Sequence, residues 1–155
     1  MVPKASPAAA PGETGLTLNI VRHYPAPASE LFLAWTDPSR VARWIGPRGV
    51  SAEVKDMEAR PGGAYVIAMH LPSGEIRTVR GVYREVAPSQ RLVFTWAWDH
   101  DGGHESLITI TFRAQGEETE MTLYQESFAN KERRDSHENG WNGSFDKLGD
   151  MLAGK

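Results

Sequence analysis

The chain has no cysteine, no long apolar run and no concentration of charge, and each lack excludes a class of protein. Without cysteine among its 155 residues, it has no disulfides, thiol nucleophiles or thiolate metal ligands. No stretch reaches the roughly 18 consecutive apolar residues of a membrane-spanning helix. Basic residues never cluster beyond Arg133-Arg134, and the net charge is −3, which argues against nucleic acid or an anionic membrane as partner. We expect a cytoplasmic protein.

The first residues differ in composition from the rest. Residues 1–15 (MVPKASPAAAPGETG) are rich in proline, alanine and glycine, and Lys4 is their only basic residue. They lack the apolar stretch of a secretory signal, so we expect a disordered tail. Residues 16–155 are enough for a single domain with a core of its own.

The first part of the domain predicts one strand and two short helices. Residues 16–24 (LTLNIVRHY) alternate and are rich in β-forming residues. Residues 28–36 place Leu31, Phe32 and Trp35 at helical spacing. Asp37-Pro38 is typical of an N-cap followed by a first-turn proline, and it predicts a second helix that ends before Gly46-Pro47.

The middle of the chain has period-two patterning and predicts six further strands. Short turns rich in glycine and proline separate these strands, which makes neighbouring strands antiparallel. The expected strands are Val50–Met57, Ala64–Leu71, Arg77–Val86, Arg91–Trp98, Ser106–Ala114 and Glu120–Phe128.

From Ala129 onward the sequence predicts one long amphipathic helix. Its apolar stripe spans an arc of about 80° at 100° per residue, and it consists of His137, Trp141, Phe145, Leu148 and Leu152. A single helix of this kind must bury its stripe against the sheet. The order β-α-α-β6-α therefore predicts an α+β domain in which a curved antiparallel sheet of about seven strands surrounds a long C-terminal helix.

Four segments in this order resemble a known family. They are TLNIVRHYPAPASELFLAWTDPSRVARWIGP, EARPGGAY, GVYREVAPSQRLVFTW and TLYQESFANKERRDSHENGWNGSFDKLGDML. Together they resemble the START-like (SRPBCC) superfamily, with its helix-grip fold. Within it, they are most similar to the family related to the activator of the heat-shock-protein-90 ATPase. The resemblance implies a hydrophobic cavity between sheet and helix, a feature shared by the lipid carriers, cyclases and aromatases of that superfamily.

The resemblance turns the inward-facing aromatic and apolar residues into candidate ligand contacts. The alternative is that these residues simply fill a solid core. The candidates are Trp44, Tyr65, Ile67, Met69, Tyr83, Phe94, Trp96, Trp98, Met121, Leu123, Gln125, His137, Trp141 and Phe145.

Among these candidates, His137 is the ionisable residue on the helix stripe. It could anchor a ligand carboxylate or phenol, or act as an acid or base. The alternative is a partly exposed histidine that bonds to a backbone carbonyl or to water. Gln125, Ser127 and the hydroxyls of Tyr65 and Tyr83 are further possible anchors.

Other kinds of site find little support. The hairpin DHDGGHE, residues 99–105, has nitrogen and oxygen ligands suited to zinc, but its paired glycines favour a solvated turn. There is no G-x-S-x-G motif, and Pro61-Gly62-Gly63 precedes a strand, so it is no phosphate-binding loop. We therefore expect no catalytic residue, metal or cofactor.

The sequence thus favours binding of a small hydrophobic or aromatic molecule between the sheet and the C-terminal helix. One alternative is a cyclase- or aromatase-like enzyme that uses an acid or base in the cavity. Another is a chaperone-linked protein-interaction module, with a solid core and an exposed apolar patch. A homodimer formed through a sheet face or edge is also possible, since unpaired strand edges can pair.

Overall fold

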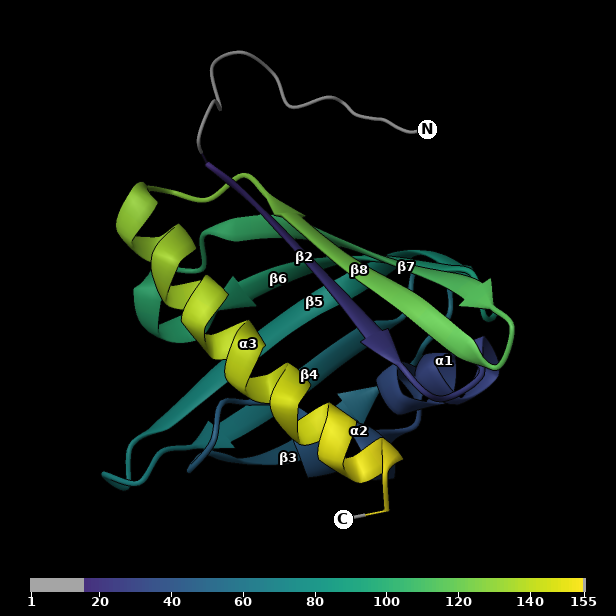
Figure 1. Cartoon of the computed structure of the whole chain (residues 1–155). Coiled ribbons are helices and arrows are strands. Elements are labelled where there is room, and N and C mark those ends of the chain that lie inside the picture. Colours follow the sequence, from purple (N-terminus) through teal and green to yellow (C-terminus); the bar gives the residue numbers. More distant parts are fainter. Residues whose placement is uncertain (1–15, 155) are drawn as a thin grey trace.

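A computed structural model describes residues 16–154, so the tail expected at 1–15 lies outside the described residues. The elements follow the predicted order (Figure 1). They are β2 (Thr17–Tyr24), α1 (Ala28–Thr36), α2 (Pro38–Trp44), β3 (Ser51–Met57), β4 (Ala64–His70), β5 (Ile76–Ala87), β6 (Arg91–Trp98), a 3-10 turn (Asp99–Asp101), β7 (Glu105–Gln115), β8 (Glu118–Glu126) and α3 (Lys131–Leu152).

The seven strands form one antiparallel sheet in the order β2-β8-β7-β6-β5-β4-β3. β2 and β3 are the edge strands. The last strand, β8, pairs with the first strand, β2, along the whole length of β2. Figure 1 shows α3 crossing one face of the curved sheet diagonally, with α1 and α2 near its C-terminal end. The predicted α+β class and helix-grip fold are confirmed.

Local signals in the sequence explain where the helices begin. The Asp37 carboxylate accepts a hydrogen bond from the Ser39 backbone N–H (3.1 Å), and Pro38 occupies the first turn of α2. The Asn130 side chain caps α3 by accepting from the Arg133 backbone N–H (2.8 Å). The predicted start of α2 is therefore confirmed.

The last strand ends earlier than the sequence predicts. Its expected span was 120–128, but β8 covers Glu118–Glu126. Ser127 adopts a left-handed backbone with φ of 73°, which turns the chain out of the sheet before Phe128. Phe128 itself is buried, so it contributes to the core from the connection rather than from the strand.

The core lies between α3, α1, α2 and the inner face of the sheet. The apolar stripe of α3 supplies Trp141, Phe145 and Leu148, which are all buried. Trp35 of α1 packs against this stripe, with ring centroids 5.8 Å from Trp141 and 6.2 Å from Phe145. Such close aromatic contacts leave little empty space under the second half of α3.

Candidate functional site: a pocket under the first half of α3

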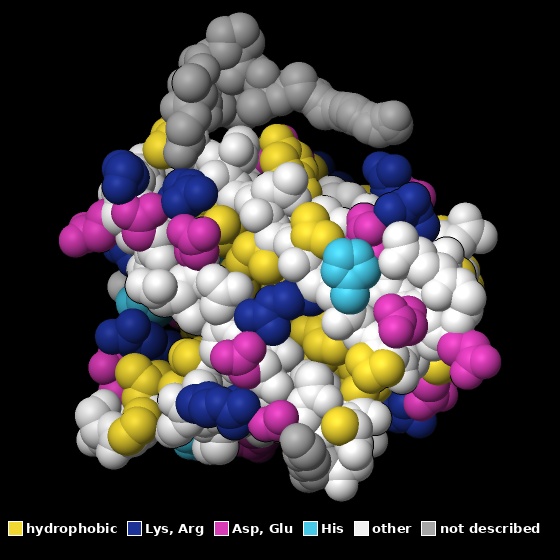
Figure 2. Space-filling view, viewed as in Figure 1, with side chains coloured by type: hydrophobic (Ala, Val, Ile, Leu, Met, Phe, Trp, Pro, Cys, Tyr) yellow, Lys and Arg dark blue, Asp and Glu magenta, His cyan; other side chains and the backbone are white. Residues whose placement is uncertain are grey.

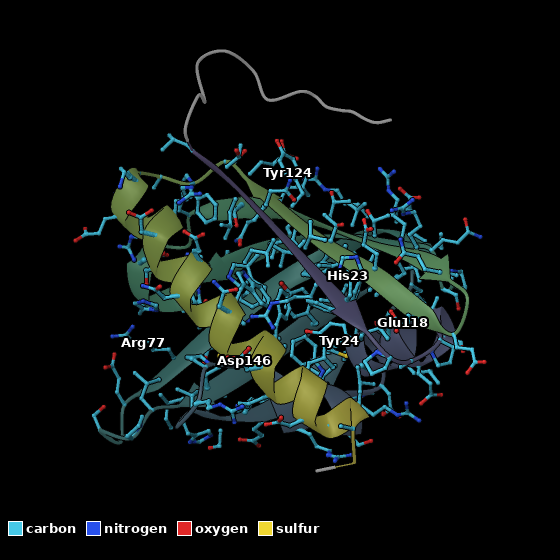
Figure 3. All side chains as sticks on the ribbon, in the orientation of Figure 1. His23, Tyr24, Arg77, Glu118, Tyr124 and Asp146 are labelled. Atoms are coloured by element: carbon cyan, nitrogen blue, oxygen red, sulfur yellow. The ribbon has the colours of Figure 1, made fainter. Side chains whose placement is uncertain are left out.

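A pocket of about 220 Å³ opens to the surface between the first half of α3, strands β4 to β6 and the connection that follows α2. Figure 3 labels Arg77, the β5 residue at its mouth. The lining consists of Ile45, Gly46, Pro47, Val50, Met69, Leu71, Arg77, Trp96, Trp98, His100, Arg133, Ser136, His137, Gly140, Trp141 and Ser144.

Three indole rings form an aromatic wall of this pocket. Trp96 and Trp98 lie two residues apart on β6, so both side chains point to the same face of the sheet. Trp141 reaches them from α3. The Trp96 ring centroid lies 5.6 Å from that of Trp98 and 5.0 Å from that of Trp141. Ligand pockets combine an apolar wall of this kind with a few polar groups.

Two glycines of α3 have different surroundings. Gly140 lines the pocket, and a Cβ built on it would meet no atom within 4 Å. At Gly143 a Cβ would lie 3.2 Å from both Cα and Cβ of Pro47. Gly143 therefore permits a close approach between α3 and the connection after α2, whereas Gly140 leaves open space at the pocket.

Behind the aromatic wall, a buried chain of hydrogen bonds fixes the indoles. Trp141 Nε1 donates to Gln125 Oε1 (2.9 Å), and Gln125 Nε2 donates to Ser106 Oγ (2.8 Å). Ser106 Oγ in turn donates to the Trp96 backbone carbonyl (3.2 Å). Gln125 is completely buried, so its amide is committed to protein partners and orients Trp141 rather than facing a ligand.

His137 also bonds to protein atoms through both ring nitrogens. Its Nδ1 lies 2.7 Å from the Arg133 carbonyl oxygen, which can only accept, so Nδ1 carries the proton. Nε2 accepts from the Trp98 indole N–H (3.0 Å). Burial holds the pKa of His137 below its ordinary value. The ring is thus a neutral positioning group that holds Trp98, with both nitrogens engaged.

Charged side chains gather at the mouth of the pocket. Arg77 and Arg133 line it, and each pairs with one carboxylate, Glu75 (3.0 Å) and Asp101 (3.3 Å) respectively. His100 lies at the same opening, where partial burial and the nearby Arg77 charge lower its pKa. Figure 2 shows basic and acidic side chains interspersed over the face that carries α3.

The structure divides the predicted contact residues into two groups. Five line the pocket: Met69, Trp96, Trp98, His137 and Trp141. Nine are buried in the core and do not line it: Trp44, Tyr65, Ile67, Tyr83, Phe94, Met121, Leu123, Gln125 and Phe145. Of the other suggested anchors, the Tyr65 hydroxyl donates to the Thr95 carbonyl (2.5 Å), and Ser127 forms the turn after β8.

Sequence reasoning missed the rest of the lining. The segment 45–50 closes one side of the pocket, and Arg77, His100 and Arg133 form its mouth. Periodicity could not find residues 45–49, which lie outside the helices and strands, and it placed Val50 in a strand that begins one residue later, at Ser51. The signal that could have found the other three is a basic residue at the end of an element. Arg77 and Arg133 lie within the first three residues of β5 and α3, and His100 lies just beyond the end of β6.

The acidic and histidine residues of the β6–β7 connection do not gather around one point. Asp99 pairs with Arg80 (2.7 Å), while His104 Nε2 lies 2.7 Å from the Ser127 carbonyl oxygen. Within residues 16–154, no group of three or more His, Cys, Asp or Glu side chains is arranged to hold a metal ion. None of the helices in that range is long and apolar enough to span a membrane.

Comparison with known proteins decides the family. The profile described as Activator of Hsp90 ATPase homolog 1-like protein matches residues 25–153. The chain belongs to this family. Residues 25–153 include every pocket-lining residue, so the pocket lies entirely within the homolog 1-like domain. None of the curated proteins matches the sequence.

Solved structures similar to this Activator of Hsp90 ATPase homolog 1-like chain share its fold over nearly their whole length. A Chromobacterium violaceum protein is 26% identical in sequence, with a TM-score of 0.84. The match covers 88% of this chain and 96% of the C. violaceum protein. The AHSA1 protein of Silicibacter pomeroyi is 26% identical with a TM-score of 0.80, covering 88% and 97%. An Arthrobacter aurescens protein at 20% identity and TM-score 0.82, covering 91% and 88%, shows the fold alone.

Proposed function

We propose that the protein binds a small apolar or aromatic molecule in the pocket under the first half of α3. The observation that carries the proposal is an open space of about 220 Å³ lined by Trp98 and bordered by the nearly buried rings of Trp96 and Trp141. A cavity of about 150 Å³ is enough for benzene, so the size suits a body of one or two rings. The START-like fold is consistent with such binding.

The arrangement of polar groups favours binding over acid–base chemistry. His137 is a half-buried titratable ring of the pocket, and its two nitrogens already bond to Trp98 and to the Arg133 carbonyl. A general acid or base must reach the proton that it transfers. An interaction module would need an exposed apolar patch. The large exposed hydrophobic residues among the described ones lie on three different elements, which does not favour that alternative; they are Val21, Leu33, Ile76 and Val82.

A variant that fills the pocket tests the proposal. The Gly140→Leu side chain would enter the space beside Trp141, because nothing lies within 4 Å of a Cβ at residue 140. Calorimetric titration with 1-naphthamide, a neutral two-ring probe, should show binding to the unchanged protein. We expect Gly140→Leu to raise its Kd by at least about tenfold, a loss of about 1.4 kcal/mol.

The matched control is Asn139→Leu, which adds the same side chain to the exposed neighbouring position of α3. This variant should bind 1-naphthamide like the unchanged protein. Thermal unfolding of both variants checks that they fold. No binding by the unchanged protein, or equal loss in both variants, contradicts the proposed site.

A further inference from the structure

The polar groups that line the pocket have an unequal balance of donors and acceptors. No aspartate or glutamate is among the lining residues, whereas two arginines, two histidines and three indoles are. Indole and guanidinium groups only donate hydrogen bonds. A ligand that satisfies such a lining must therefore present acceptor atoms.

Several of these donors are already committed to protein partners. The Trp98 indole donates to His137, and the Trp141 indole donates to Gln125. The Ser144 hydroxyl donates to the Gly140 carbonyl (3.0 Å). These groups shape the wall and are not available as donors to a ligand.

Trp96 is the indole whose donor remains. Its side chain is only 4% exposed, yet among the described residues its Nε1 has no hydrogen-bond partner. A buried donor without a partner costs free energy, and the ring that carries it borders the pocket. The chemistry of the ligand is therefore inferred from the two arginines at the mouth.

The two guanidinium groups at the mouth also retain donors. The bonds from Arg77 to Glu75 use Nε and Nη2, and the pair between Arg133 and Asp101 uses Nη1. Each guanidinium has five N–H donors, so both can bind a second anion. Asp101 is only 7% exposed, whereas Glu75 is half exposed, so Arg77 is the arginine with the looser partner.

We propose that the ligand of this pocket is an apolar molecule with a single anionic oxygen group, such as a carboxylate, which binds at the mouth between Arg77 and Arg133. Its ring body then packs against Trp96, Trp98 and Trp141. The inference rests on the proposed function and adds the chemical class of the ligand. Planar carboxylates match the fork of an arginine.

A pair of probes that differ in one charge tests the inference. 1-Naphthoate and 1-naphthamide share a ring body, and only the first is anionic. We expect calorimetry to give a Kd at least tenfold lower for 1-naphthoate than for 1-naphthamide. Added salt should weaken the binding of 1-naphthoate while leaving that of 1-naphthamide unchanged.

Arg77→Gln removes one mouth charge while keeping most of the aliphatic side chain. It should weaken the binding of 1-naphthoate more than that of 1-naphthamide, and so reduce the preference for 1-naphthoate to threefold or less. The matched control is Arg80→Gln on the same strand, because Arg80 also pairs with an exposed carboxylate, that of Asp99, and does not line the pocket. Arg80→Gln should leave both Kd values unchanged.

The outcomes separate the inference from the proposed function. Equal binding of the two probes, or a preference for 1-naphthoate that Arg77→Gln leaves intact, overturns the anionic ligand while the pocket remains a binding site. If neither probe binds, both the inference and the proposed function fail.

Discussion

At the scale of single residues, the pocket depends on side chains that hold other side chains. Gln125 and His137 are polar residues on the inner side of the fold, and each accepts a hydrogen bond from one indole of the aromatic wall. Neither offers its committed atoms to a ligand. Their part in the site is to fix the ring positions of Trp141 and Trp98, which is why we call them positioning residues.

Gln125→Met tests this part directly. The substitution keeps the length of the side chain, but the Trp141 indole N–H loses its acceptor and Ser106 Oγ loses the bond that it accepts from Gln125. Because these groups are buried, we expect the free energy of unfolding to fall by about 1–3 kcal/mol. Urea denaturation followed by tryptophan fluorescence measures it. An unchanged midpoint would mean that the hydrogen-bond chain contributes nothing to the fold.

His137 makes stability depend on pH in a defined direction. Its pKa is lower in the folded chain than in the unfolded chain, because partial burial of the ring disfavours its charged form. The unfolded state therefore takes up a proton first as the pH falls through about 6.5. The stability contributed by the neutral ring is complete above that pH and is lost progressively below it, when protonated Nε2 can no longer accept from Trp98.

We expect His137→Gln to flatten this dependence between pH 7 and 5. Both proteins in this comparison, with and without His137→Gln, should also carry His100→Gln, because the pKa of His100 is lowered as well and would add its own pH dependence. The carboxylates whose pKa values are depressed, such as Asp99 and Asp135, act at lower pH and leave this window clear. Equal slopes of unfolding free energy against pH, with and without His137, would refute this role of the ring.

At the scale of elements, α3 is the part of the fold that makes the pocket possible. Its second half is fastened to β2, where the Tyr24 hydroxyl donates to the Phe145 carbonyl (2.9 Å) and Arg22 pairs with Asp146 (3.1 Å). Figure 3 shows Tyr24 and Asp146 close to this half of the helix. The first half spans the pocket, and Gly140 in it contributes no side chain.

Alanine at two glycines of α3 should have different effects. Glycine inside a helix costs up to about 1 kcal/mol relative to alanine. Gly140→Ala should recover most of that cost, because its Cβ meets no neighbour. Gly143→Ala must press against the backbone and ring of Pro47, 3.2 Å away. Thermal unfolding should therefore show that the Gly140→Ala variant is more stable than the Gly143→Ala variant, by about 1 kcal/mol or more in the free energy of unfolding. The reverse order of stability would contradict the packing described.

Sequence periodicity was sufficient for most elements but not for the site. Alternation and turn residues located each strand, and the stripe of α3 located its buried face, because those patterns follow from backbone geometry. The same rules predict only that a residue points inward. They cannot tell Phe145, packed against Trp35, from Trp141, which also borders open space. That difference depends on how the helix and sheet are spaced in three dimensions.

At the scale of the whole molecule, the interior combines a filled half with an open half. Under the second half of α3, the aromatic rings of the core leave little space, as a solid core requires. Under the first half, the segment 45–50 and strands β4 to β6 stand far enough from the helix to leave the pocket. The sequence is compatible with either a cavity or a filled core. In the described part of the chain, the pocket and the packed core lie side by side under α3.

The central claim is that a small molecule binds in the open half, and the indole resonances test it most directly. Three of the five tryptophans, Trp96, Trp98 and Trp141, line the pocket, while Trp35 and Trp44 do not. In an NMR titration of the ¹⁵N-labelled protein with 1-naphthamide, we expect the Nε1–H signals of the first three to shift most. Signals that stay in place, or shifts led by Trp35 and Trp44, would contradict binding at this pocket.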